Sequence, residues 1–413
     1  MDLANVSPDR LSTELDTLAT FSDAPAPAVT RVVYSESDKR ARDYLKGLIA
    51  EVGLSVREDA LGNLFARWEG SEPDLPAVAT GSHIDAIPFA GRFDGTVGVL
   101  GGLEAFRTLK ASGFAPRRSL ELILFTSEEP TRFGVGCFGS RALSGVLSPA
   151  ALAELRDDDG VSVLQAAQHA GFTGDVADVQ LAVGHYHAFV ELHIEQGPRL
   201  EALGKPIGVV SAVAAPATLN FTLTGSGGHA GAVLMGDRRD ALQAGAELAQ
   251  RVERAALATG SADSVATVGI FDVHPRAVNS IPSRVFMTAD VRDTDLGRRD
   301  KMVEAIRAAA QDVATRRGLE VEATLLNADP PATCAAEIVA ASLGAAQTEG
   351  LEAETLVSRA YHDTLFMARV CPVGMIFIPS QYGYSHRPDE YSSPEEIAQG
   401  VRVLALTLAT LAR

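Results

Sequence analysis

The chain has 413 residues and a formal net charge of −17, from 36 Lys and Arg against 53 Asp and Glu. Nucleic acids and anionic membranes bind proteins that carry an excess of basic residues, so this balance predicts neither as a partner. A hydrophobic share of 46% and a charged share of 22% are ordinary for a globular protein, and the length predicts two domains.

The cysteines and the N-terminal residues bear on the compartment. The three cysteines lie far apart and form no Cys-x-x-Cys pair, which predicts neither a disulfide framework nor a thiolate zinc site. The first residues lack the basic and then apolar order of a secretory signal, and no run of about 18 apolar residues occurs. We therefore expect a cytoplasmic protein.

The first half of the chain alternates between helical and strand-like patterns. A helical period over 38–52 precedes two strand-like runs between 54 and 68. Apolar strands are then predicted at 76–80 and 120–125, with a helix between them, and another strand begins at Ala188. Loops at the carboxyl ends of strands in open α/β sheets are where ligands bind.

The pattern changes near residue 209 and resumes near residue 329. Between these positions the expected order is β-α-β-β-α-β, which is typical of a ferredoxin-like domain. The sequence thus predicts an α/β catalytic domain, with a mixed sheet covered by helices, formed by 1–208 and 329–413. A ferredoxin-like α+β lid domain at 209–328 is predicted to interrupt it.

Groups able to bind a metal follow the predicted strands. His83 and Asp85 point to the same side of an extended segment, so Asp85 is placed to accept the second N–H of a metal-bound imidazole. Asp94 lies beside a glycine in the next loop, and Glu128 and Glu129 follow an apolar strand, where paired carboxylates are costly without a cation. Each feature alone also fits a solvated loop, a turn or a helix start.

Two further histidines change this balance. His193 and His386 are each expected at the end of an apolar strand, where a lone histidine is more often a hydrogen-bonded core residue than a ligand. Three histidines beside carboxylates together predict a site for two metals about 3.5–4 Å apart. One uncoordinated carboxylate must take a proton from water, and the Glu128 and Glu129 pair offers one ligand and one base.

Three residues of the predicted insertion are candidates for substrate contact. His229, in a glycine-rich turn, is either a loop residue or a donor to a developing oxyanion. Arg292 ends an alternating strand, where it is either solvated or holds a substrate carboxylate through two hydrogen bonds. Because Arg292 follows Asn279 by thirteen positions, both are expected to face the cleft from adjacent strands.

A nucleophile pair of Cys137 and His362 is a weaker alternative, because nothing in the sequence brings the two together.

Six motifs in order resemble the amidase/carbamoylase branch of the M20 metallopeptidase-like hydrolases, over almost the whole chain. They are GSHIDAIPFAGRFDG, TSEEPTRFG, ELHIEQGP, GGHAGAVLM, NSIPSR and YSHRPDE. The branch includes N-carbamoyl-L-amino acid hydrolases, allantoate amidohydrolases and ureidoglycolate amidohydrolases. The stretches SRAYHDTLFMARVCPVGMIFIP and GYSHRPDEYSSPEEIAQGV are most similar to the last of these groups. Carbamoylases and allantoate enzymes more often have a GAGHDA-like segment at 359–363.

The resemblance implies a centre of two divalent metal ions, usually Mn²⁺ in this branch, with Zn²⁺ as the alternative. One ion would be held by His83, Asp94 and His193. The other would be held by Asp94, Glu129 and His386, with Asp94 as the bridge. The general base would be Glu128.

The resemblance also implies roles outside the metal ligands. Asp85 would orient the first imidazole, and the substrate would be held by Gln196, Asn279 and Arg292. The family dimerises through its lids, so His229 would act as an oxyanion donor in the site of the partner subunit.

The predicted reaction is hydrolysis of a linear ureido amide, with (S)-ureidoglycolate giving glyoxylate, ammonia and carbon dioxide in purine (allantoin) catabolism. The alternatives are an N-carbamoyl-L-amino acid hydrolase, an allantoate amidohydrolase or, from a different class, a non-catalytic protein that binds a ureido ligand. Glu128 argues against the last, because a binding protein needs no free base. The expected partners are a small ureido carboxylate and a second copy of the chain.

Overall fold

The computed structural model describes residues 5–413, which form two compact units. Unit 1 takes in the residues up to Ser211 together with Thr333–Ser358 and His362–Arg413. Unit 2 takes in Ala212–Ala332 and Arg359–Tyr361. Within residues 5–413, no helix is long and apolar enough to cross a membrane.

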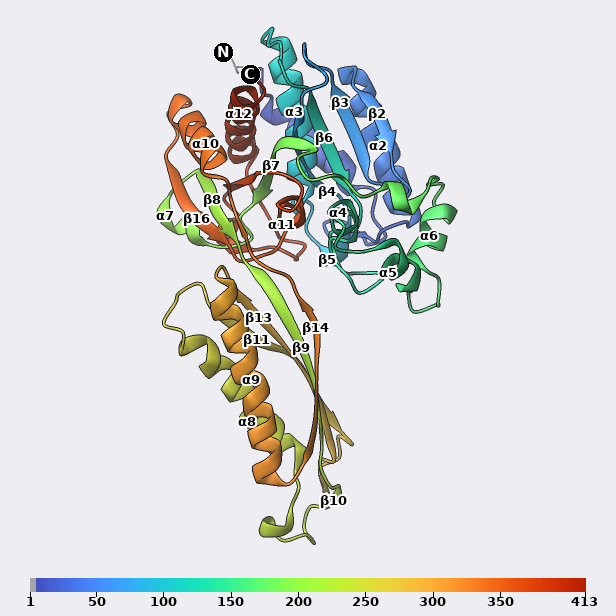
Figure 1. The fold of residues 1–413 in the computed structure, drawn as a ribbon, viewed down its shortest axis with the longest axis vertical. Coiled ribbons are helices and arrows are strands. Elements are labelled where there is room, and N and C mark those ends of the chain that lie inside the picture. The colour runs from blue at the N-terminus through green and yellow to red at the C-terminus, as the bar shows by residue number, and fades with distance from the viewer. Residues whose placement is uncertain (1–4) are drawn as a thin grey trace. The chain divides into compact units, whose positions relative to one another are not determined.

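A nine-stranded sheet forms the centre of unit 1 (Figure 1). Its order is β15-β8-β17-β7-β4-β6-β3-β2, and β16 pairs with β8. The strands are β2 (Ser55–Glu58), β3 (Leu64–Trp68), β4 (Ala77–His83), β6 (Leu120–Phe125), β7 (Tyr186–Ile194), β8 (Ile207–Val213), β15 (Ala332–Thr333), β16 (Ala353–Ser358) and β17 (Val373–Ile378). The four central strands β17, β7, β4 and β6 are mutually parallel, whereas β8, β3 and β2 pair antiparallel with their neighbours. The carboxyl ends of the four central strands therefore lie at one edge.

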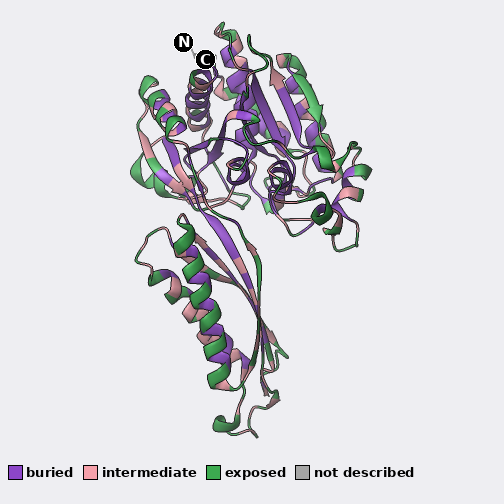
Figure 2. Cartoon of the chain, viewed as in Figure 1, coloured by how far each residue is buried: buried purple, intermediate pink, exposed green. Residues whose placement is uncertain are grey.

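Helices cover both faces of this sheet, because successive strand residues enter two different core clusters. In β6, Leu122 and Leu124 join one cluster and Ile123 and Phe125 join the other, as expected for strands buried on both sides. One cluster is completed by α1 (Pro8–Ala19), α2 (Glu36–Val52), α3 (Thr96–Ala111), α10 (Ala336–Thr348) and α12 (Pro394–Leu411). The other is completed by α4 (Phe138–Leu143), α5 (Pro149–Glu154), α6 (Val163–His169) and α11 (Asp363–Met367). The predicted α/β fold with a mixed sheet is confirmed, and the central strands are buried except at His187 (Figure 2).

Capping chemistry explains where the last helix begins. Ser393 accepts the N–H of Glu396 while the Glu396 side chain accepts the N–H of Ser393, and Pro394 occupies the first helical position. This helix, α12, runs from Pro394 to Leu411. It packs against α3 and α10. Smaller elements of unit 1 are β1 (Val29–Arg31), β5 (Ala86–Ala90), α7 (Arg199–Leu203), η1 (Val176–Asp178) and η3 (Gln381–Gly383).

Unit 2 is a four-stranded antiparallel sheet packed against two helices. Its elements are β9 (Ala215–Thr224), α8 (Ala241–Leu257), β11 (Val265–His274), β13 (Arg284–Asp293), α9 (Leu296–Arg317) and β14 (Glu320–Ala328), with sheet order β11-β13-β9-β14. Two-residue strands β10 (Gly228–His229) and β12 (Ser280–Ile281) pair separately, and η2 is Met235–Asp237. Strand β8 was predicted to lie largely inside the inserted domain. It instead pairs with β17 in the sheet of unit 1, because its apolar residues complete that core.

Candidate metal centre

Parallel strand ends bring three of the predicted ligands to one edge of the sheet of unit 1. His83 is the last residue of β4, His193 is the last but one of β7, and Glu129 lies four positions after β6. The expectation that His386 ends a strand was wrong. Strand β17 stops at Ile378, and His386 lies on the following loop with a positive φ of 58°.

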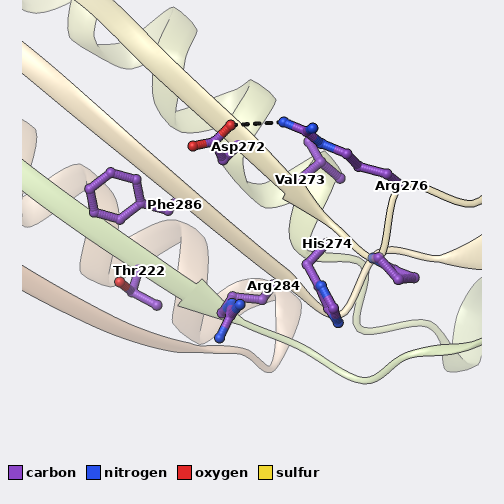
Figure 3. Close-up of a pocket in the computed structure, with 8 residues that line it drawn as sticks. Thr222, Asp272, Val273, His274, Arg276, Arg284 and Phe286 are labelled. Carbon is purple, nitrogen blue, oxygen red and sulfur yellow. Dashed lines mark hydrogen bonds and ion pairs between the residues drawn. The ribbon is translucent and has the colours of Figure 1, made fainter.

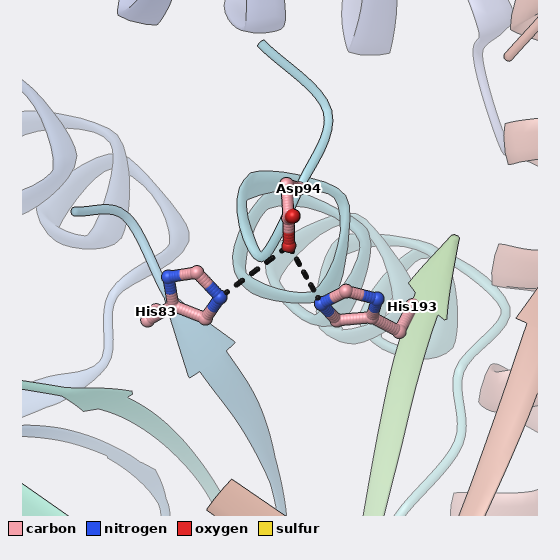
Figure 4. A group of neighbouring side chains, drawn as sticks. All are labelled: His83, Asp94 and His193. Atoms are coloured by element: carbon pink, nitrogen blue, oxygen red, sulfur yellow. Dashed lines mark ion pairs between the residues drawn. The ribbon is translucent and has the colours of Figure 1, made fainter. Parts of the chain in front are cut away.

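Asp94 stands between two groups of possible ligand atoms. Its Oδ1 lies 3.6 Å from His83 Nε2 and 3.2 Å from His193 Nε2 (Figure 4). Its Oδ2 lies 3.2 Å from His386 Nε2, which is also 3.3 Å from Glu129 Oε1. Within each group all ligand atoms lie within 4.8 Å of one another. One carboxylate thus presents one oxygen to each group.

Backbone contacts fix how the two buried imidazoles are presented. The Nδ1 of His83 lies 3.1 Å from the carbonyl oxygen of Asp85, and the Nδ1 of His193 lies 2.9 Å from that of Ile194. A carbonyl can only accept, so each Nδ1 carries the proton and each Nε2 is turned toward Asp94. The Gly95 N–H donates to His193 Nε2 at 3.2 Å, which agrees with this assignment. Metal-binding histidines have this arrangement.

A glycine allows the α3 N-terminus to approach the imidazoles. Gly95 caps α3 with a φ of 68°, and a Cβ at this position would lie 2.4 Å from His83 Nε2. A side chain would therefore occupy the space between the candidate ligand atoms, and it would also disfavour the backbone conformation.

The centre requires positive charge. Burial raises the pKa of Asp94, but its contacts with the three histidines outweigh this and hold that pKa well below its usual value. Hydrogen bonds to Asp94 and Glu129 raise the pKa of His386 to about 11. Burial lowers the pKa of His83, yet the carboxylates around it raise that pKa well above its usual range. The imidazole and carboxylate donor set fits divalent ions, which would supply positive charge here.

Glu128 is buried beside these groups without being one of them. Its Oε2 lies 3.8 Å from His83 Nε2, and its Oε1 accepts a hydrogen bond from the Cys137 thiol at 3.4 Å. Burial and then the charge of Glu129 raise the pKa of Glu128 well above its usual value, although His83 partly opposes this. A carboxylate with a raised pKa next to a metal-binding group is suited to accept a proton from water and give it up again.

Comparisons with known proteins agree with this arrangement. Residues 79–410 match the family described as peptidase family M20/M25/M40. The chain belongs to this family. It is 54% identical over 411 residues to a ureidoglycolate hydrolase of Oryza sativa subsp. japonica, covering 98% of this chain and 85% of that protein. It is also 39% identical to an N-carbamoyl-L-amino acid amidohydrolase of Geobacillus stearothermophilus, over 98% of both chains.

Solved structures give the same relationship. Crystal structures of AtUAH in complex with (S)-hydroxyglycine and with glyoxylate superpose with TM-scores of 0.90 and 0.89. Both are 52% identical in sequence to this chain, and each alignment covers 99% of both chains. The M20 chain is therefore an amidohydrolase that acts on C–N bonds.

The Asp85 carboxylate has different partners from those expected. It lies 3.6 Å from His83 Nδ1, too far for a hydrogen bond, and accepts the backbone N–H groups of Glu128 and Glu129 at 3.1 and 3.0 Å. In the turn after β6 that carries these N–H groups, Ser127 has a φ of 56°. The backbone carbonyl of Asp85 therefore orients the His83 imidazole. The Asp85 carboxylate instead holds the backbone of Glu128 and Glu129 in place.

Gln196 was predicted to contact the substrate from the catalytic domain. Its Nε2 donates to Asp94 Oδ2 at 2.8 Å and lies 3.3 Å from Ser385 Oγ. Its buried Oε1 has no hydrogen-bond partner within residues 5–413. The Gln196 side chain therefore contacts Asp94 through its NH₂ group, and its Oε1 can still accept a hydrogen bond.

Three buried carboxylates of this M20 centre were missed by the sequence reasoning. Glu191, inside β7, accepts from Ser82 Oγ at 2.7 Å and from the Thr364 N–H at 3.1 Å. Asp363 accepts from a serine hydroxyl, and burial followed by the charge of Glu191 raises the pKa of Asp363 to about 8. Glu390 accepts hydrogen bonds from two backbone N–H groups of the loop that carries Asp94. A charged residue within the apolar run FVELHI was the available signal for Glu191, whereas Asp363 and Glu390 lie within family-like stretches whose spacing indicates no role for either.

The cysteine and histidine considered as a nucleophile pair have other partners. Burial raises the pKa of Cys137 well above its usual value, and the nearby charge of Glu128 adds to this, so the thiol stays protonated and is a poor nucleophile. His362 lies 3.0 Å from Ser358 Oγ through Nε2, and its ring packs against His193 with centroids 4.4 Å apart.

The substrate candidates of unit 2 lie in two places. The Asn279 carbonyl accepts the N–H of Ala230 at 2.9 Å, beside His229, which pairs with Ser280. Arg292 lies near the far end of β13, where its Nε donates to Asp290 at 2.7 Å. The two were expected on adjacent strands, but Asn279 precedes β12, which pairs with β10, whereas Arg292 lies in β13, which pairs with β11 and β9. The chain must first traverse most of β13, so the two are separated by roughly 25–30 Å at about 3.3 Å per residue.

Unit 2 also has a hollow of about 560 Å³ on its sheet (Figure 3). Three basic side chains line it, and its one carboxylate, Asp272, pairs with Arg276 at 3.1 Å. It contains none of the candidate ligand groups. The hollow therefore lacks the chemistry of the metal centre.

Proposed function

We propose that the chain is a metal-dependent amidohydrolase that hydrolyses (S)-ureidoglycolate at its ureido carbonyl. The observation that carries the proposal is Asp94 between two ligand groups, with Glu128 beside them as a carboxylate outside both groups. The identity of 54% with a ureidoglycolate hydrolase over nearly the whole chain supports the choice of substrate.

The metal ligands in this proposal are those at the edge of the sheet. One divalent ion would be held by His83, Asp94 and His193, and the other by Asp94, Glu129 and His386. Mn²⁺ suits imidazole and carboxylate ligands in the absence of thiolates, and Zn²⁺ is the alternative. Bound ions of this kind polarise a carbonyl and lower the pKa of water.

Glu128 moves the proton. Its Oε2 faces the His83 imidazole and is placed to accept a proton as water adds to the ureido carbonyl. The same carboxylic acid then protonates the leaving nitrogen. Burial disfavours the charged form of Glu128, so the protonated form is accessible after the first transfer.

The expected products account for every atom. Water and ureidoglycolate give ammonia, carbon dioxide and hydroxyglycine, and hydroxyglycine loses a second ammonia to give glyoxylate. AtUAH has been crystallised with (S)-hydroxyglycine and with glyoxylate, which supports this order. The setting in this proposal is allantoin catabolism in the cytoplasm.

Unit 2 is the lid in this proposal, and the separation of its candidate residues supports a homodimer. His229 and Asn279 lie together, but Arg292 lies roughly 25–30 Å away along β13. Since a ureido carboxylate is far shorter than that, one lid cannot supply all three to one substrate. Arg292 of one copy would hold the substrate carboxylate, and His229 and Asn279 of the other would face its carbonyl.

Assays on three substrate types test the function. Ammonia release from ureidoglycolate, allantoate and several N-carbamoyl-L-amino acids would be compared at equal protein concentration with added Mn²⁺. Preference for (S)-ureidoglycolate is expected. A preference for N-carbamoyl amino acids would favour the alternative supported by the Geobacillus stearothermophilus relative, and binding without turnover would identify a ureido-binding protein.

A further inference from the structure

Glu390 is a buried carboxylate that contacts the Asp94 loop without being a candidate ligand. Only 4% of its surface is exposed. Its Oε1 accepts the backbone N–H groups of Phe93 at 2.9 Å and Asp94 at 3.1 Å. Its Oε2 lies 2.9 Å from the Ser385 hydroxyl. One side chain thus joins the loop that carries Asp94 to the loop that carries His386.

We propose that Glu390 is a positioning residue that holds Asp94 between the two groups of ligand atoms and so sets the affinity for metal. The proposal rests on the proposed function in taking Asp94 as the bridging ligand. Two N–H groups on one acceptor fix the peptide from which the Asp94 side chain projects. The contact between Glu390 and Ser385 also helps to hold the Asp94 carboxylate, because Ser385 Oγ lies 3.0 Å from Asp94 Oδ2.

Gly91 gives a second observation of the same contact. A Cβ at this position would lie 2.4 Å from both Cβ and Oε1 of Glu390. Gly91 has no positive φ, so its backbone conformation does not require glycine. The close approach of the loop to the Glu390 side chain explains the glycine instead, and a methyl group there must displace Glu390.

An acceptor at position 390 should be sufficient for this role. In Glu390→Gln the amide oxygen can still accept from Phe93 and Asp94, and the NH₂ group can donate to Ser385. In Glu390→Ala two buried N–H groups lose their acceptor, and the loop must move to find another. A positioning role therefore predicts rescue by glutamine.

The test uses Mn²⁺ titration of the metal-stripped full-length protein by calorimetry, together with kcat and KM on ureidoglycolate. Glu390→Ala is expected to weaken Mn²⁺ binding by on the order of 10–100-fold, as is usual when a side chain that orients a metal ligand is removed. Gly91→Ala should weaken it similarly, and Glu390→Gln should stay within a few-fold of the wild type.

Two controls separate this effect from a loss of folding. Glu104→Ala removes another buried carboxylate, which pairs with Arg10 and Arg107 away from the centre, and Gly344→Ala adds a methyl group with no atom within 4 Å. Both should bind Mn²⁺ normally, and circular dichroism should show every variant folded. Wild-type Mn²⁺ affinity in folded Glu390→Ala would overturn the inference while the function stands. A wild type that turns over none of the ureido substrates would instead overturn the function.

Discussion

The metal centre of unit 1 and the substrate candidates of unit 2 differ in how they are held. Asp94 and the imidazoles of His83 and His193 are buried, and each imidazole is oriented by a backbone carbonyl. His229 is exposed, and Arg292 is paired with Asp290. The candidate metal ligands are therefore assembled within one unit, whereas the candidate substrate residues of unit 2 lie in two places. In the proposed function, the chemistry depends on groups fixed at the carboxyl ends of the strands, whereas substrate recognition depends on residues from two copies of the chain.

Removing the metals should have the largest effect and tests the first half of this comparison. A chelator should abolish turnover, and Mn²⁺ should restore it. Hydrogen bonds raise the pKa of His386 to about 11 in the metal-free protein, so its imidazole is protonated at neutral pH. Metal must displace that proton, so binding should release protons and apparent affinity should rise between about pH 6 and about pH 8.

Calorimetry in two buffers of different ionisation enthalpy measures this proton release. Proton uptake on binding, or an affinity that falls as the pH rises, would contradict the protonated state assigned to His386. Full turnover in the chelated protein would exclude the metal centre as the catalytic site.

The next largest effect should come from Glu128→Gln. This variant keeps the size of the side chain but removes the base, so kcat should fall by about 10²- to 10⁴-fold with metal content unchanged. Glu129→Gln is the matched variant, since it changes the neighbouring carboxylate in the same way and should lower metal content. If Glu128→Gln lost metal but was active when Mn²⁺ was resupplied, Glu128 would be the metal ligand and Glu129 the base.

The strand ends made the clustering of the candidate metal ligands predictable from sequence. His83, His193 and Glu129 lie at or just after parallel strands, so a linear pattern was enough to bring them together. The hydrogen bond from Phe93 to Glu390 joins residues 297 positions apart. No local pattern encodes such a contact, because it depends on how two loops pack. The error for Asn279 and Arg292 arose because sequence spacing gives the number of residues between two positions but not the direction of the chain.

Arg292→Lys should have an intermediate effect and tests the second half of the comparison. Lysine cannot keep the contact with Asp290 and also offer two parallel N–H groups to a substrate carboxylate. We expect kcat/KM to fall by on the order of 10–100-fold, mostly through KM, with Mn²⁺ still bound. Unchanged kinetics would assign the substrate carboxylate to another residue.

A mixing experiment sharpens this test. Arg292→Ala and Asn279→Ala should each be nearly inactive, but a heterodimer of the two has one site with both residues intact. Random reassociation gives heterodimers in half of the dimers, so about one quarter of wild-type activity should return. No recovery on mixing, with dimer exchange confirmed, would mean that one copy supplies both residues.

The smallest expected effect concerns the thiol that contacts the base. Cys137 is fully buried and donates to Glu128 Oε1, and its backbone N–H donates to the Glu128 carbonyl at 2.8 Å. Cys137→Ala removes only the thiol contact, so kcat should fall by a few-fold to about 10-fold while KM and metal content stay the same, since a thiol is a weak donor. Cys371→Ala is the matched control, because it removes a buried thiol that contacts the Met367 carbonyl instead. Equal losses in the two variants would attribute the effect to packing, whereas a loss confined to Cys137→Ala would show that the carboxylate must be held for proton transfer.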